Sequence, residues 1–280
     1  MRGVRLIAGW LLCVLAGTGL ADEPLEFGVL NQRSALLTAQ YWNPILAYVS
    51  EKSGVPLRLK MGRTAPETTA MTVRGDFDFV YTNHLFTPKR DLLGYRVIAR
   101  PNNNGIQGAI VVPDTSDVKS ITDLMGKEVG FPSPDAFAGY WLTMDALQKS
   151  KLYVRPVFGS NQEGTMAQLR AGRVVAASVN AQIMENYARR ENYRYRTIWR
   201  SEVYYDLPVM ANPRVPRAKV EAVANALVGI AQDEEGKRIL RAGAELLKLE
   251  GTPGFVAATD RNYDNYRRFY RNTALPLNDE

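Results

Sequence analysis

The stretch DFDFVYTN, residues Asp76–Asn83, is the most informative part of the sequence about the fold class. Its apolar residues Phe77–Tyr81 predict a strand, and the polar loop Thr82-Asn83-His84 follows directly. In open α/β sheets, ligands bind beyond the carboxyl ends of the strands. The stretch therefore predicts a strand of an α/β sheet whose end carries four candidate binding residues, Tyr81, Thr82, Asn83 and His84.

Short apolar strands alternate with helical patterns on both sides of this stretch, which favours an α/β protein with mostly parallel sheets. Residues 25–30 and 55–61 predict two of the strands. Asn43-Pro44 predicts a helix start, with Asn as the cap and Pro in the first turn. The capping box Thr64–Glu67 predicts a second helix start.

A turn-rich segment, RPNNNG at residues 100–105, divides the chain into two sets of strands and helices. The first set occupies residues 22–102 and the second residues 103–203. Beyond Pro216 the pattern is helical, with no sheet of its own, so we expect the C-terminal part to pack on the first set. This organisation predicts one lobe from residues 22–102 plus 204–280 and another from residues 103–203, joined by two chain crossings.

The N-terminus has the pattern of a cleaved secretory signal peptide, residues 1–21. Arg2 and Arg5 precede the short apolar run of residues 6–16, and Gly19-Leu20-Ala21 fits a cleavage site. The alternatives are an uncleaved membrane anchor, for which the apolar run is short, and a lipoprotein, for which Leu11-Leu12 before Cys13 lacks a small residue. Cleavage after Ala21 would give an exported chain without cysteine.

The 280 residues include one histidine and one cysteine, which excludes most imidazole metal sites and all disulfide frameworks. The motifs of phosphate-binding loops, serine hydrolases and zinc proteases are missing from the sequence. No spacing selects a pair of carboxylates for catalysis. We therefore expect no metal, no cofactor and no enzymatic activity.

Two further helix starts are candidate anion sites, because exposed backbone N–H groups and the helix dipole favour negative charge. They lie at Arg63–Glu67 and Ser133–Phe137. A helix start also follows the strand pattern at residues 154–158, where Gln162 and Glu163 are candidates to bind a hydroxyl or a cationic group. Each of these starts can equally serve as an ordinary helix cap, and His84 can equally cap its own loop.

Two basic and aromatic runs, YARRENYRYR at residues 187–196 and YDNYRRFYR at residues 263–271, resemble the side chains that stack on single-stranded nucleic acid. Both runs also contain acidic residues, Glu191 and Asp264, and have the spacing of exposed helix or strand faces. Because the signal peptide predicts export, we interpret both runs as solvent-exposed faces of a helix or strand, and we expect no nucleic-acid partner.

Three stretches resemble one known family: DFDFVYTN, SITDLMGKEVGF at Ser120–Phe131 and AGRVVAASVN at Ala171–Asn180. The family is the periplasmic phosphate/phosphite/phosphonate-binding proteins of ABC importers. The resemblance implies the type II solute-binding fold, in which each of two lobes is a mainly parallel sheet flanked by helices, with two hinge crossings. It also implies a periplasmic location, with a small anion and an inner-membrane permease as partners. We expect the protein to be a monomer.

In this family a Tyr-x-Asn loop holds the oxyanion, which the resemblance assigns to Tyr81 and Asn83. The second lobe contributes a helix start rich in hydroxyl groups, but here Ala136-Phe137-Ala138 stands in its place, next to Asp135. Each lost hydroxyl removes a charge-assisted hydrogen bond worth about 1.5–3 kcal/mol. The resemblance places Gln162-Glu163 at the family's His-Glu pair, and Thr68 where an aromatic contact is expected.

The expected binding residues thus form two walls and an outer shell. Tyr81, Thr82, Asn83 and His84 line one wall; Ala136, Phe137, Gln162, Glu163 and Asn180 line the other; Tyr41, Arg63 and Thr68 lie further out.

The leading hypothesis is a periplasmic solute-binding protein that closes two lobes around a small polar, oxyanionic ligand for an ABC importer. The alternative is a periplasmic sensor module that reports ligand occupancy to a membrane histidine kinase or diguanylate cyclase. An exported hydrolase is a third hypothesis, disfavoured because no activated nucleophile is visible.

Overall fold

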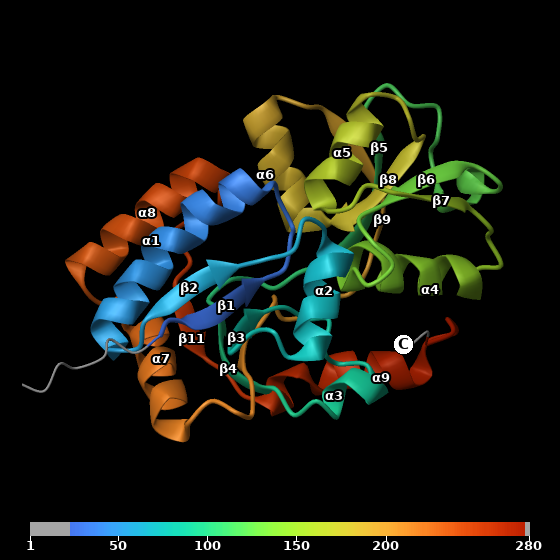
Figure 1. The fold of residues 1–280 in the computed structure, drawn as a ribbon. Coiled ribbons are helices and arrows are strands. Elements are labelled where there is room, and N and C mark those ends of the chain that lie inside the picture. The colour runs from blue at the N-terminus through green and yellow to red at the C-terminus, as the bar shows by residue number, and fades with distance from the viewer. Residues whose placement is uncertain (1–22, 278–280) are drawn as a thin grey trace, which may run out of the picture.

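The computed structural model describes residues 23–277, which form two β-sheets with helices packed around them (Figure 1). The first sheet has the strand order β11-β4-β10-β3-β1-β2 and the second β7-β6-β8-β5-β9. The predicted signal peptide and its cleavage point lie outside the described residues. Within residues 23–277, no helix combines the length and apolar character needed to cross a membrane.

The first sheet joins parallel and antiparallel strands. β1 pairs in parallel with β2 and β3, whereas β10 pairs antiparallel with β3 and β4, and β11 antiparallel with β4. Its strands are β1 (Leu25–Val29), β2 (Leu57–Lys60), β3 (Phe79–Tyr81), β4 (Arg96–Pro101), β10 (Val209–Ala211) and β11 (Phe255–Ala257).

The second sheet is mixed in the same way. β6 pairs in parallel with β7 and β8, and β5 pairs antiparallel with β8 and β9. Its strands are β5 (Gly108–Pro113), β6 (Glu128–Phe131), β7 (Arg155–Phe158), β8 (Ala176–Asn180) and β9 (Tyr195–Arg200). In both sheets the parallel pairs come from strands joined through helices, and the strands next to the crossings run antiparallel.

Helices cover both sheets. Those around the first sheet are α1 (Ala35–Ser53), α2 (Ala65–Arg74), α3 (Pro88–Asp91), α7 (Arg217–Gly229), α8 (Glu234–Leu247), a 3₁₀ turn (Asp260–Tyr263) and α9 (Asp264–Asn272). The second sheet has a 3₁₀ turn (Ile121–Leu124), a π-helical turn (Phe137–Trp141), α4 (Leu142–Lys149), α5 (Gln162–Arg170) and α6 (Ala181–Glu191). In Figure 1, α8 lies alongside α1, so the C-terminal part packs against the N-terminal part.

The predicted helix start at Asn43-Pro44 is wrong. α1 begins after Ser34, whose side chain accepts a hydrogen bond from the Leu37 N–H (3.3 Å), and Pro44 lies inside the helix. Proline removes one helical hydrogen bond, but the buried face that includes Trp42 and Ile45 continues through it. The second predicted start is confirmed, since Thr64 caps α2 by accepting from the Glu67 N–H.

The C-terminal part also contributes a strand that the sequence pattern missed. After Pro216 the pattern predicts only helices, yet β11 (Phe255–Ala257) pairs with β4 at one edge of the first sheet. Three residues are too few to show an alternating pattern, so the strand is formed by its sheet neighbour rather than by local preference.

Two segments connect the sheets, residues 102–107 and residues 201–208. They pair with each other: Ile106 N–H donates to Tyr204 O (2.7 Å), and Tyr204 N–H donates to Ile106 O (2.9 Å). Asn103 Nδ2 also donates to the Asp206 carboxylate (2.6 Å). The two crossings therefore form a short paired ribbon between the sheets.

Gly105 is required for this ribbon. Its φ is +85°, and a Cβ there would overlap the Tyr204 carbonyl oxygen. We expect Gly105→Ala to lower the free energy of unfolding by about 1–3 kcal/mol in urea denaturation, because the left-handed backbone and the overlap both penalise a side chain. Gly126→Ala is the matched control, since φ is +70° and the space is open. Equal losses for both variants would contradict a steric role for the ribbon.

Candidate functional site between the two sheets

A small cavity lies between the end of β3 in the first sheet and the segment after β6 in the second. Its volume is about 20 Å³, which is room for about one water molecule. The polar side chains that line it come from both sheets: Asn31, Gln32, Asn83, His84, Ser133, Gln162 and Asn180.

Asn83 and His84 form the first wall because they directly follow β3. His84 is buried, and its Nδ1 lies 2.8 Å from Thr69 Oγ1 on α2. Burial lowers the pKa of His84 from 6.5 to about 4. The positive charge of Arg90 lowers this pKa further, whereas the negative charge of Asp135 raises it. The imidazole is therefore neutral at pH 7 and offers hydrogen bonds rather than positive charge.

Asn31 stands beside this wall and was missed by the sequence analysis, although a polar residue directly after a strand was a usable signal. Thr68 Oγ1 donates to Asn31 Oδ1 (2.5 Å) and accepts from the Gly62 N–H (2.8 Å). Asn31 Nδ2 donates to Gly62 O (2.9 Å). Thr68 is therefore a buried support behind Asn31 rather than a lining residue.

Ser133 on the second wall was predicted only as part of the segment Ser133–Phe137 and not as a binding residue itself. Its side chain is 1% exposed, and its Oγ atom has no hydrogen-bond partner within residues 23–277. Buried hydroxyl groups are nearly always hydrogen-bonded, so an unpartnered one in a cavity indicates a place for a bound group.

Gln162 and Asn180 complete this wall from α5 and β8. Gln162 Oε1 accepts from the Asn180 backbone N–H (2.9 Å). The Asn180 side chain caps α6 by accepting from the Gln182 N–H (2.9 Å). Both side chains are buried, so these bonds fix their positions.

Ala136 and Phe137 also line the cavity, at the start of the π-helical turn. The Phe137 ring is 1% exposed and packs against aromatic side chains that belong to the core of the first sheet, with ring centroids 4.1 Å from Tyr266 and 4.8 Å from Tyr204. Phe137 thus joins the core of the first sheet, and Asp135 beside it pairs with Arg90 (2.9 Å). That ion pair neutralises the charge of Asp135 next to the cavity.

Five other predicted residues, including Tyr41, lie outside this cavity. Thr82 is buried behind it and accepts from the His84 N–H (3.1 Å). Arg63 is exposed and lines none of the described cavities. Glu163 on α5 connects the helices of the two sheets. It accepts a hydrogen bond from the Ser34 N–H at the start of α1 (3.1 Å) and pairs with Arg190 on α6 (2.7 Å). Tyr81 lines a second, larger cleft.

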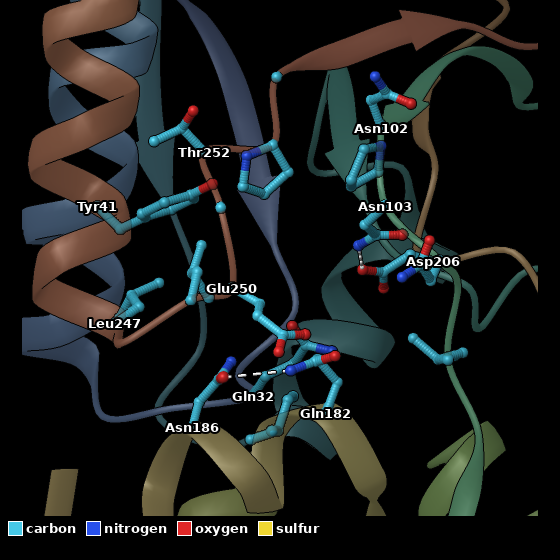
Figure 2. Close-up of a pocket in the computed structure, with 18 of the residues that line it drawn as sticks. Gln32, Tyr41, Asn102, Asn103, Gln182, Asn186, Asp206, Leu247, Glu250 and Thr252 are labelled. Atoms are coloured by element: carbon cyan, nitrogen blue, oxygen red, sulfur yellow. Dashed lines mark hydrogen bonds between the residues drawn. The ribbon is translucent and has the colours of Figure 1, made fainter. Parts of the chain in front are cut away.

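That second cleft has a volume of about 420 Å³ and contains Tyr41 as well as Tyr81 (Figure 2). It is bounded by α1, the start of α6, the two crossings and the segment after α8. Gln32, Ile106 and Asn180 line both the cleft and the small cavity, so the two spaces adjoin. Within the described part of the chain, no cluster of three His, Cys, Asp or Glu residues fits a metal ion.

Several solved structures superpose on most of this chain. The binding protein component of an ABC phosphonate transporter from Pseudomonas aeruginosa superposes with a TM-score of 0.74 at 16% identity, over 89% of this chain and 86% of that one. PhnD1 from Prochlorococcus marinus, in complex with methylphosphonate, gives 0.72 at 16% identity, over 88% and 97%. A Xanthomonas citri protein bound to ATP gives 0.67 at 13% identity, over 88% and 95%.

These likenesses show the type II periplasmic binding protein fold. No curated protein sequence matches the chain. The model of one protein family, described as ABC transporter, phosphonate, periplasmic substrate-binding protein, matches residues 27–263. The chain therefore belongs to the family of periplasmic substrate-binding proteins of ABC phosphonate transporters.

Proposed function

We propose that this chain captures a small solute bearing an oxyanion between lobe 1 (residues 22–102 plus 204–280) and lobe 2 (residues 103–203). Members of its family bind solutes rather than transform them, in the periplasm, and pass them to a permease of the inner membrane. The oxyanion would contact Asn83 and His84 from lobe 1, and Ser133, Gln162 and the Ala136–Phe137 backbone from lobe 2.

The buried Ser133 hydroxyl is the observation that carries this proposal. It is a hydrogen-bond donor without a partner in the part of the chain described, and it faces a cavity lined by carboxamides and a neutral imidazole. A hydrogen bond from a hydroxyl to a charged oxygen contributes about 1.5–3 kcal/mol. An anion bound here would be held by such bonds and by the helix start, without a cationic side chain in the cavity.

A tetrahedral oxyanion is larger than one water molecule, so binding must widen the cavity. Rotation of the lobes about the paired crossings at Ile106 and Tyr204 would supply the room. Methylphosphonate, the ligand of the Prochlorococcus relative, is small enough to require only a modest widening.

Isothermal titration calorimetry with phosphate, phosphite, methylphosphonate and sulfate tests the proposal. We expect at least one to bind, and Ser133→Ala to weaken that binding by about 10- to 100-fold, because one charge-assisted bond is lost. Ser150→Ala, a change of the same size at an exposed position, should leave the affinity unchanged.

The Ser133 hydroxyl makes no bond within the described chain, so Ser133→Ala should unfold at the same temperature as the wild type. Failure of all four anions to bind would overturn the oxyanion proposal. Binding that is indifferent to Ser133→Ala would remove this cavity as the site.

We further propose that residues 1–21 are removed on export and that the mature protein is a monomer. Mass spectrometry of periplasmic protein should then give a chain beginning at Asp22, and sedimentation analysis should give one chain per particle. A retained N-terminus would indicate the membrane anchor instead.

A further inference from the structure

The larger cleft beside the small cavity has the size of a ligand site, because such pockets usually have volumes of about 300–1,000 Å³. Figure 2 shows Tyr41 extending into it from α1, with Gln182 and Asn186 of α6 on the opposite side. Gln32 and Asn180 line both spaces, so one solute can extend from the cavity into the cleft.

Asn186 supplies an unsatisfied donor in this cleft. The residue is 1% exposed; its Oδ1 accepts from Gln182 Nε2 (3.3 Å, Figure 2) and from Arg189 (2.7 Å). Its Nδ2 has no hydrogen-bond partner among residues 23–277. A buried amide N–H pair without an acceptor is costly, so this atom favours a solute that brings an acceptor.

Asp206, which also lines the cleft, supplies hydrogen-bond acceptors (Figure 2). One of its oxygens accepts from Asn103 Nδ2 (2.6 Å) and the other from the Leu207 N–H (2.7 Å), which leaves further lone pairs on both. Burial raises the pKa of this carboxyl group, although both hydrogen bonds oppose the shift. A donor from a solute would therefore stabilise the carboxylate.

These two side chains together limit the chemistry of the group between them. A second anionic group would accept a hydrogen bond from Asn186. It would, however, be repelled by two carboxylates that line the cleft, Asp206 and Glu250, and attracted by only one lining guanidinium, Arg33. An ammonium would suit Asp206 but offers no acceptor to Asn186. A hydroxyl group both donates and accepts, so it is the group that suits both residues.

The remaining wall is aromatic. Tyr41 and Trp42 meet edge to face with ring centroids 5.7 Å apart, and Trp42 lies 4.8 Å from Tyr81. All three line the cleft. Flat aromatic faces beside carboxamides provide both apolar contact and hydrogen bonds, which suits a ring that has C–H faces and hydroxyl edges.

We propose that the solute of this protein carries a hydroxyl-bearing organic group of about the size of a pentose, and that this group occupies the cleft between Tyr41, Asn186 and Asp206. The inference rests on the proposed function, since the anionic end of the same solute lies toward Ser133. It assigns a substrate class larger and more polar than a simple alkyl phosphonate.

Calorimetry with ribose 5-phosphate and methyl phosphate tests the inference, because the two compounds share an anionic group and differ in the hydroxylated ring. Ribose 5-phosphate should bind at least about tenfold more tightly. Asn186→Leu should abolish most of that difference, and Asn186→Asp, which keeps the acceptor for Gln182 and Arg189, should do the same. Gln148→Leu, at an exposed position of α4, is the matched control and should preserve the difference.

Equal affinities for the two compounds would overturn the inference while leaving the proposed function intact. Failure of both compounds to bind, together with failure of phosphate, phosphite, methylphosphonate and sulfate, would overturn the proposed function itself. A difference in affinity that persists in both Asn186 variants, at unchanged unfolding temperature, would exclude the cleft as the site of the ring.

Discussion

Replacing Phe137 with alanine is expected to lower the free energy of unfolding by about 3–5 kcal/mol. The ring follows β6 of the second sheet in the chain but is buried among Tyr204, Tyr266 and Tyr270, at centroid distances of 4.8, 4.1 and 5.6 Å. Its removal loses the transfer free energy of the ring and leaves a void among the tyrosine rings that surround it. Urea denaturation followed by tryptophan fluorescence gives the measurement.

Phe158→Ala is the control for Phe137→Ala. Phe158 is an aromatic residue of β7 in the second sheet, but it is 41% exposed and contacts Phe131 and Tyr140 on the same side of the crossings. Its truncation should cost about 1 kcal/mol, since less surface leaves contact with water. Losses of similar size for the two variants would show that Phe137 does not link the two sheets.

The position of the Phe137 ring also shows which part of the site the sequence could not predict. The sequence Ser133-Pro134-Asp135 predicted that Phe137 lies at a helix start after β6, and Phe137 does line the cavity. Its contact with Tyr266 joins residues 129 positions apart, and no local pattern encodes such a partner. A residue expected only to line the binding site is therefore also a structural link between the two sheets.

The alternation of strands and helices predicted the α/β class, because each strand is a short apolar run between helical patterns, and the family resemblance implied the type II fold. It did not predict that β10 and β11 run antiparallel to β4. Strand direction depends on where the chain returns after crossing between sheets, and β11 is too short to show a period. The helix start predicted at Pro44 was wrong for a related reason. Burial of Trp42 and Ile45 stabilises the helix through Pro44, although proline locally disfavours a helix interior.

Side chains at strand ends were the predictable part of the candidate site. Asn83, His84 and Asn180 follow β3 or end β8, and all three line the cavity. Glu163 lies one position beyond Gln162 on α5, where the helix turn directs it to Ser34 and Arg190 instead. Asn186 lies within α6, and its free donor depends on which side chains its neighbours already bind, so the sequence contains no signal for it.

His84 should make the stability of the protein depend on pH. Burial lowers its folded-state pKa from 6.5 to about 4, with Asp135 raising it and Arg90 lowering it. Below pH 6.5 the unfolded chain binds a proton at His84 that the folded chain does not bind. The contribution of His84 to the free energy of unfolding is therefore fully present above pH 6.5 and decreases toward pH 4. Between pH 7 and pH 5 the loss from this residue should be about 2 kcal/mol, at 1.36 kcal/mol per pH unit below 6.5.

Urea denaturation at pH 7 and pH 5, on wild type and His84→Gln, isolates this effect. His84 is the only histidine in the sequence, and glutamine keeps a polar group facing Thr69 without a titrating ring. Carboxyl groups contribute alike to both proteins, so the variant should lose about 2 kcal/mol less than the wild type over this interval. Parallel losses would mean that His84 is solvated enough to take up a proton in the folded state. The neutral imidazole that the oxyanion proposal places beside Ser133 would then be charged at pH 5, and anion affinity would rise on acidification instead of staying level.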